Sequence, residues 1–103
     1  MDQVEFLKEA TFIVKRNTNA AVVRVAVRFD DATKHLSVIY CFDHQLNDDY
    51  TDWCELTCGE LIAAFAEIKT AETTCCVTDE DWQSKVAKAD VVYSRASWTQ
   101  SLP

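Results

Sequence analysis

The sequence predicts an α+β domain, with a mostly antiparallel sheet of four to five strands that opens with a β-hairpin and has helices packed on one face. Three observations support this class: apolar residues at helical spacing near the N-terminus, two alternating strand-like segments joined by a short polar loop, and further helical and β-branched segments behind them. The 103 residues fit a single domain over 1–103, with a tail at 96–103 that is expected to fray.

The first helix is expected over residues 3–15. Asp2 and Glu5 have the spacing of a capping box, in which each residue can satisfy a backbone N–H at the helix start. Asn17 opens a polar turn that ends this segment. The apolar residues at helical spacing are Phe6, Leu7, Ala10, Ile13 and Val14.

Residues 20–30 and the segment from Leu36 to Phe42 are expected to form the hairpin, because both alternate and a loop of only a few residues at 30–34 joins them. Such a short connection requires antiparallel pairing. Arg24 and Arg28 would face away from the apolar side. That apolar side comprises Val23, Val25, Val27 and Phe29 of the first strand and Leu36, Val38, Tyr40 and Phe42 of the second.

Residues 50–56 are compatible with a third strand or with the start of a long helix capped by Asp52. We favour the strand, because Thr57 and Glu60 form a second capping box and Gly59 is unfavourable inside a helix. The second helix is then expected over 58–68, burying Leu61, Ile62, Phe65 and Ile68.

Three more elements complete the predicted order. Residues 72–77 suit a strand, and Thr78 or Asp79 can cap a short helix over 79–88 that buries Trp82 and Val86. Residues 90–95 are expected to form the last strand.

Negative charge is concentrated in the middle of the chain. The net charge is −7, yet the stretch from His35 to Ser84 carries eleven acidic residues and one basic residue, Lys69. Such a surface repels nucleic acid and anionic lipid, and it attracts basic proteins. The alternative is a solvated surface that keeps the protein in solution.

The acidic residues are densest in two clusters, Asp48–Glu55 and Thr78–Trp82, and each cluster also contains large aromatic residues. This favours a binding surface because Trp and Tyr are enriched in interface hot spots. Trp53 and Trp82 could instead belong to the core. The predicted partner-binding residues are Asp48, Asp49, Tyr50, Asp52, Trp53, Asp79, Glu80, Asp81 and Trp82.

Most catalytic classes lack support. A single glycine provides no phosphate-binding loop, and His44 with Cys54 and Cys58 falls short of a zinc set, so no cofactor and no metal site are expected. A thiol enzyme remains as an alternative, with Cys58 activated in the first turn of the second helix. The absence of a signal-like start and the odd cysteine count lead us to expect a cytoplasmic protein with reduced thiols.

The acidic, aromatic run from Asp48 to Ile68 and the Asp90–Arg95 end resemble bacterial toxin-immunity proteins, including those of contact-dependent growth inhibition. The resemblance implies a non-enzymatic cytoplasmic protein that binds a cognate toxin domain, often a basic nuclease, and occludes its active site. A general acidic adaptor, or a nucleic-acid mimic with another basic partner, is the alternative within the binding class.

Overall fold

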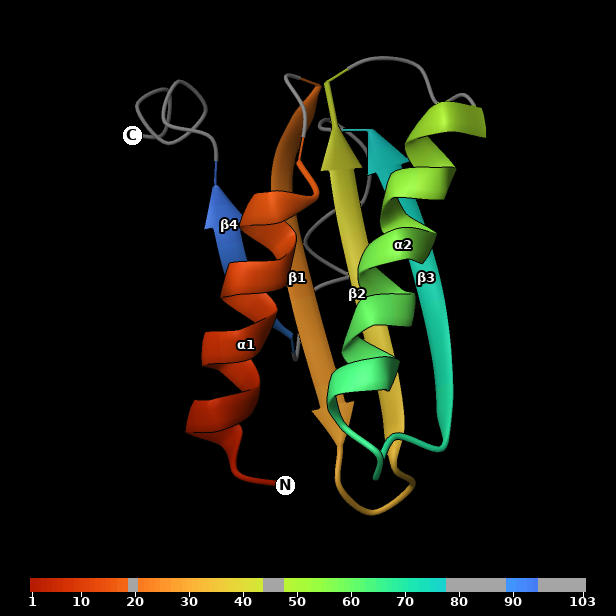
Figure 1. Ribbon diagram of the computed structural model, residues 1–103. Helices are drawn as coiled ribbons and strands as arrows, with labels where there is room; N and C mark the ends of the chain where they lie inside the picture. The colour runs from red at the N-terminus through yellow and green to blue at the C-terminus, as the bar shows by residue number, and fades with distance from the viewer. Residues whose placement is uncertain (19–20, 44–47, 78–88, 95–103) are drawn as a thin grey trace.

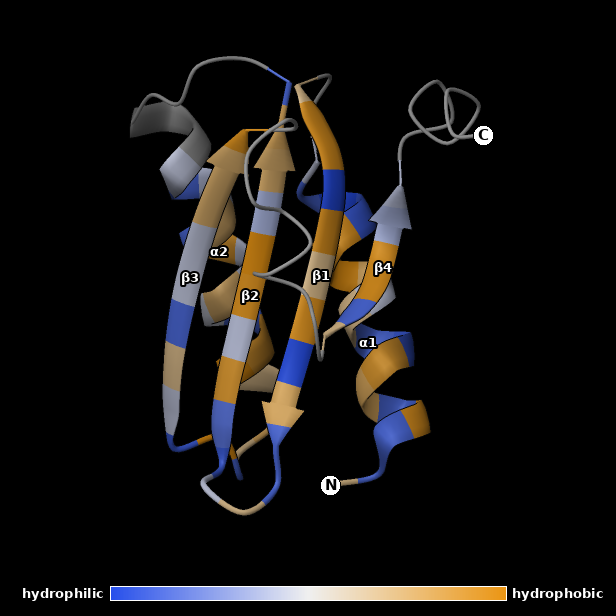
Figure 2. Cartoon of the chain, turned by 180° about the vertical axis from the view of Figure 1, so that it is seen from behind, coloured by the Kyte–Doolittle hydropathy of each residue, from blue (hydrophilic) through white to orange (hydrophobic). Residues whose placement is uncertain are grey.

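A computed structural model describes residues 1–18, 21–43, 48–77 and 89–94. These residues form two helices and a four-stranded sheet in the order β3-β2-β1-β4. Both helices lie on one face of the sheet, with α1 over β1 and β4 and α2 over β2 and β3, as Figure 1 and the reverse view in Figure 2 show. The predicted α+β class, with a mostly antiparallel sheet and helices on one face, is confirmed.

Helix α1 spans Gln3–Arg16 and matches the prediction closely. The Asp2 side chain accepts hydrogen bonds from the backbone N–H of Val4 at 2.9 Å and of Glu5 at 3.3 Å, which satisfies two donors that the helix leaves unpaired. Its buried face consists of Phe6, Ala10, Ile13 and Val14. Four of the five apolar residues that were predicted from the helical spacing are therefore the ones that α1 buries.

Strands β1 (Val22–Asp30) and β2 (His35–Phe42) form the predicted antiparallel hairpin. Asp30 closes the turn by accepting hydrogen bonds from the N–H groups of Ala32 and Thr33 at 2.9 and 3.3 Å. A register shift between Val22 and Arg24 places Val22 in the main core. The predicted facing of β2 and of β1 from Val25 to Phe29 is confirmed by their burial.

Helix α2 spans Asp48–Ala64, so the predicted strand at 50–56 is wrong and the second helix begins ten residues earlier than its predicted start at 58. Thr57 is buried within the helix and its hydroxyl lies 2.5 Å from the Tyr40 hydroxyl, so it does not cap a helix end. Glu60 forms an ion pair with Arg16 of α1. The two residues taken for a capping box are therefore occupied by tertiary contacts.

Strand β3 spans Thr70–Val77 and pairs parallel to β2, while β4 (Asp90–Ser94) pairs antiparallel to β1. Both confirm strands predicted at 72–77 and 90–95. Helix α2 connects the parallel pair β2 and β3, as such pairs require a crossover. The predicted helix over 79–88 and the tail at 96–103 lie outside the described residues.

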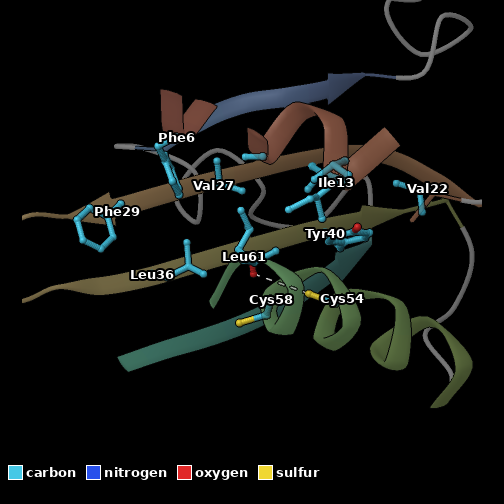
Figure 3. Packing of buried hydrophobic residues seen from close by; sticks show 14 of the residues in the cluster. Phe6, Ile13, Val22, Val27, Phe29, Leu36, Tyr40, Cys54, Cys58 and Leu61 are labelled. Carbon is cyan, nitrogen blue, oxygen red and sulfur yellow. Dashed lines mark hydrogen bonds between the residues drawn. The ribbon is translucent and has the colours of Figure 1, made fainter. Parts of the chain in front are cut away.

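The main core lies between the helices and the sheet (Figure 3). Phe6 packs against Phe29 and Phe65, with ring centroids 5.9 and 5.7 Å apart, which joins α1 to β1 and to the end of α2. Of the residues predicted to be buried by the second helix, Leu61 and Ile68 are buried and Phe65 is half-buried. Ile62 is 42 % exposed, so that prediction is wrong, because the side of α2 that faces the sheet runs through Cys54, Thr57 and Leu61 and leaves Ile62 at its margin. The helix also ends at Ala64 instead of the predicted 68, so Phe65 and Ile68 lie beyond it.

Candidate functional site

Helix α2 is the most acidic element of the described chain. Its 17 residues contain five acids and no base. The helix dipole favours acids in the first turn, which accounts for Asp48 and Asp49. Glu55 lies beyond that turn and is exposed, so the dipole does not explain it. The charge of α2 therefore exceeds what helix formation favours.

An open hollow of about 150 Å³ is lined by Asp52, Trp53 and Leu56. Asp52 is exposed, Trp53 is half-buried, and Leu56 is 48 % exposed. A carboxylate therefore stands beside apolar surface that a partner side chain can reach. This combination suits the alkyl stem and charged head of a Lys or Arg residue.

The predicted partner-binding set divides into two groups. Helix α2 brings Asp48, Asp49, Tyr50, Asp52 and Trp53 together within its first two turns. Trp53 is partly buried, so it is neither a fully buried core residue nor fully exposed. The second group, Asp79, Glu80, Asp81 and Trp82, lies outside the described residues. Participation of either group in binding stays a prediction.

Sequence reasoning missed the apolar residues on the outer side of α2. Leu56 and Ile62 are 48 % and 42 % exposed, although both are large and aliphatic. A helical period starting at Asp48 would have placed Leu56 opposite the buried series of Cys54, Thr57 and Leu61, and Ile62 on its flank. Starting the helix at 58 concealed that pattern, since Leu56 was then assigned to a strand.

The thiol arrangement corrects the catalytic alternative. Cys58 lies in the middle of α2 and not in its first turn, so the helix N-terminus does not stabilise its thiolate. Burial, followed by the negative charge of Glu55, raises the pKa of the Cys58 thiol. The geometry thus favours a structural cysteine over a nucleophile.

Cys54 faces the sheet, as Figure 3 shows, where its Sγ lies 3.8 Å from the Val38 carbonyl oxygen and 3.9 Å from that of Thr74. A hydrogen bond with the Cys75 thiol, together with burial, raises the pKa of Cys54. Cys54 is fully buried, so it fills space between α2 and the β2–β3 pair.

Polar side chains near the start of β2 have structural partners on β3. His35 Nδ1 lies 2.7 Å from Thr70 Oγ1, and its Nε2 lies 3.3 Å from Glu72, to which Ser37 also donates a hydrogen bond. These contacts link β2 to β3. Within the described ranges, no three His, Cys, Asp or Glu side chains are grouped to hold a metal ion. Neither described helix has the length and apolar character needed to cross a membrane.

Comparison with protein families gives a match to the MafI2 immunity protein model over residues 17–97. The chain belongs to the MafI2 immunity protein family. The match covers every described strand and the whole of α2, and so includes the acidic surface. No curated protein matches the chain.

The resemblance to bacterial toxin-immunity proteins is thereby confirmed. Membership indicates a toxin-neutralising role and a cognate toxin as partner. The contact-dependent growth-inhibition subclass is a finer prediction that the match does not address.

Proposed function

We propose that this chain neutralises its cognate toxin by covering the toxin's active site with an acidic, aromatic surface, and that the toxin domain is a basic nuclease. The observation that carries the proposal is the composition of α2: five acids, no base, and an exposed carboxylate beside a half-buried tryptophan. In such a complex, carboxylates occupy the positions that the toxin uses for substrate phosphates. The aromatic side chains anchor the contact.

The proposed contact surface contains the two predicted groups, Asp48–Trp53 and Asp79–Trp82. Charge in these groups steers encounter with a basic partner and pairs with its Lys and Arg residues. Family membership supports a role in binding rather than in catalysis, and we propose that the protein is not an enzyme and acts in the cytoplasm of the producing cell. Delivery of the toxin by contact-dependent inhibition is also part of the proposal.

The first test is capture of a partner at low and high salt, with the product of the adjacent gene added. The expected result is one basic protein, bound less strongly at high salt and inactive as a nuclease in the complex. A captured toxin without nuclease activity overturns the nuclease assignment. Capture of a basic protein that has no toxic activity instead supports the acidic adaptor, and no capture leaves the acids as solvated surface.

The second test locates the surface. Asp49→Lys combined with Asp81→Lys is expected to slow association with the captured toxin by about tenfold or more, because both charges reverse within the steering field. Glu9→Lys combined with Asp90→Lys makes the same change in net charge at exposed positions on α1 and β4 and is the matched control. Equal affinity for the wild type and the first variant removes this surface from the proposal.

A further inference from the structure

Gly59 is the only glycine in the sequence, and it lies inside α2. Glycine weakens a helix interior relative to alanine, because its backbone loses more freedom on folding. Its φ is not positive, so the backbone does not require glycine. A Cβ atom built at this position would meet nothing within 4 Å, so packing against the described residues does not require it either. Neither the backbone nor the packing of the described residues therefore accounts for glycine at this position, which directs attention to contacts with a partner.

The surroundings of Gly59 are apolar and open to solvent. Leu56 and Ile62 lie three residues before and after it, which places all three on neighbouring turns of one helix face. Their exposed fractions are 48 % and 42 %. Ala63, four residues after Gly59, is also exposed and continues this surface. Because Gly59 has no side chain, a partner can approach the helix backbone closely between Leu56 and Ile62. We call this open position at Gly59 the notch.

Charge around this notch selects the kind of partner. Asp52 and Glu55 are both exposed, and they lie four residues before Leu56 and Gly59 respectively, on the same face. A second copy of this chain would bring two acidic α2 helices together, which is unfavourable. Anionic lipid and nucleic acid are repelled for the same reason. A basic protein surface with an apolar centre is the complementary partner.

We propose that the outer face of α2, centred on Gly59 and bounded by Asp52, Leu56 and Ile62, is the docking surface for the cognate toxin. The toxin would place backbone or a side chain against Gly59, apolar groups against Leu56 and Ile62, and a Lys or Arg residue at Asp52. This inference rests on the proposed function. It places the centre of the contact about three turns beyond Asp48, the acidic start of α2.

The test uses the complete chain and the catalytically inactivated toxin domain encoded beside it. Gly59→Ala is expected to raise the midpoint of thermal unfolding by about 2–8 °C, since a helix favours alanine. The same substitution is expected to weaken toxin binding, and Gly59→Leu is expected to raise Kd by about 30-fold or more, because a large side chain fills the notch. Gln3→Leu adds the same side chain at an exposed position of α1 and should leave Kd unchanged.

The exposed apolar pair provides a second measurement. Leu56→Ala and Ile62→Ala are each expected to raise Kd by about tenfold, while the unfolding midpoint changes by less than about 3 °C, because nearly half of each side chain is already exposed before binding. If the wild type binds the toxin and the Gly59 and apolar variants bind it with the same Kd, this inference is overturned and the proposed function stays intact. Absence of any wild-type complex with the toxin overturns both.

Discussion

The buried hydrogen bond between Tyr40 and Thr57 provides a direct measure of how α2 is held on the sheet. Both side chains are fully buried, and their hydroxyl oxygens lie 2.5 Å apart. The Asn17 carbonyl oxygen lies 3.5 Å from the Tyr40 hydroxyl, too far for a strong second bond. Tyr40→Phe would leave the Thr57 hydroxyl without its tyrosine partner, and Thr57→Val would leave Tyr40 with only the long contact to Asn17.

Each single substitution is expected to lower the free energy of unfolding by about 1–3 kcal/mol, the cost of leaving a buried polar group without its partner. For a domain of this size, 1 kcal/mol corresponds to about 4–8 °C in the unfolding midpoint. The double variant removes both hydroxyls and keeps the shape. Its loss should therefore be smaller than the sum of the single losses by about 1 kcal/mol.

Chemical denaturation of the wild type, the two single variants and the double variant measures this coupling. Thr73→Val, at an exposed position of β3, is the matched control and should change stability by less than about 0.5 kcal/mol. Additive losses would contradict the bond. They would instead agree with Thr57 acting alone, as the N-cap of a helix that starts at 58.

Three further predictions concern other parts of the fold. Asp2→Ala removes the cap of α1 and should lower the free energy of unfolding by about 1 kcal/mol. The neighbouring exposed substitution Gln3→Ala is the control and should lower it by less than about 0.5 kcal/mol. Equal denaturation midpoints for the two variants would argue against the cap. Leu61→Ala leaves a cavity at a buried site and should lower the free energy of unfolding by about 2–5 kcal/mol. Ile62→Ala, on the outer side of α2, should lower it much less, as measured by chemical denaturation. The reverse order would mean that α2 packs a different face against the sheet. Stability should also fall as the pH rises above about 8.5, because the unfolded thiols ionise there while burial keeps the folded Cys54 and Cys58 thiols protonated. Cys58→Ala should make that slope less steep by removing one of these thiols, and an unchanged slope would refute the contribution of Cys58.

The hairpin was predictable because its information is local. Alternation in β1 and β2 separates apolar from polar positions, and the connecting loop is too short for anything but antiparallel pairing. The same holds for α1, where a capping aspartate and the helical period agree. Where local signals support one another, the element and the side that it buries both follow from the sequence.

Helix α2 was mispredicted because its strongest local signals serve other purposes. Thr57 and Glu60 have capping-box spacing, yet their partners are Tyr40 and Arg16, which are distant in the sequence. Gly59 argues locally against one long helix that begins before residue 58, but α2 contains it without strain. Tertiary contacts that offset a weak helix former are not visible in a local pattern. The outer apolar residues of the candidate site were missed for the same reason.

The two sides of α2 meet different physical demands, and this separates stability from binding. Cys54, Thr57 and Leu61 are fully buried on the inner side and hold the helix on the sheet. The outer side combines Gly59, which weakens a helix interior, with exposed acids at Asp52 and Glu55, whose charge lies beyond the first turn that the helix dipole favours. A helix that gained only stability from these positions would carry alanine at 59 and some basic residues near its end. Substitutions on the outer side can therefore stabilise the free protein and weaken the complex at once, whereas inner substitutions should weaken both.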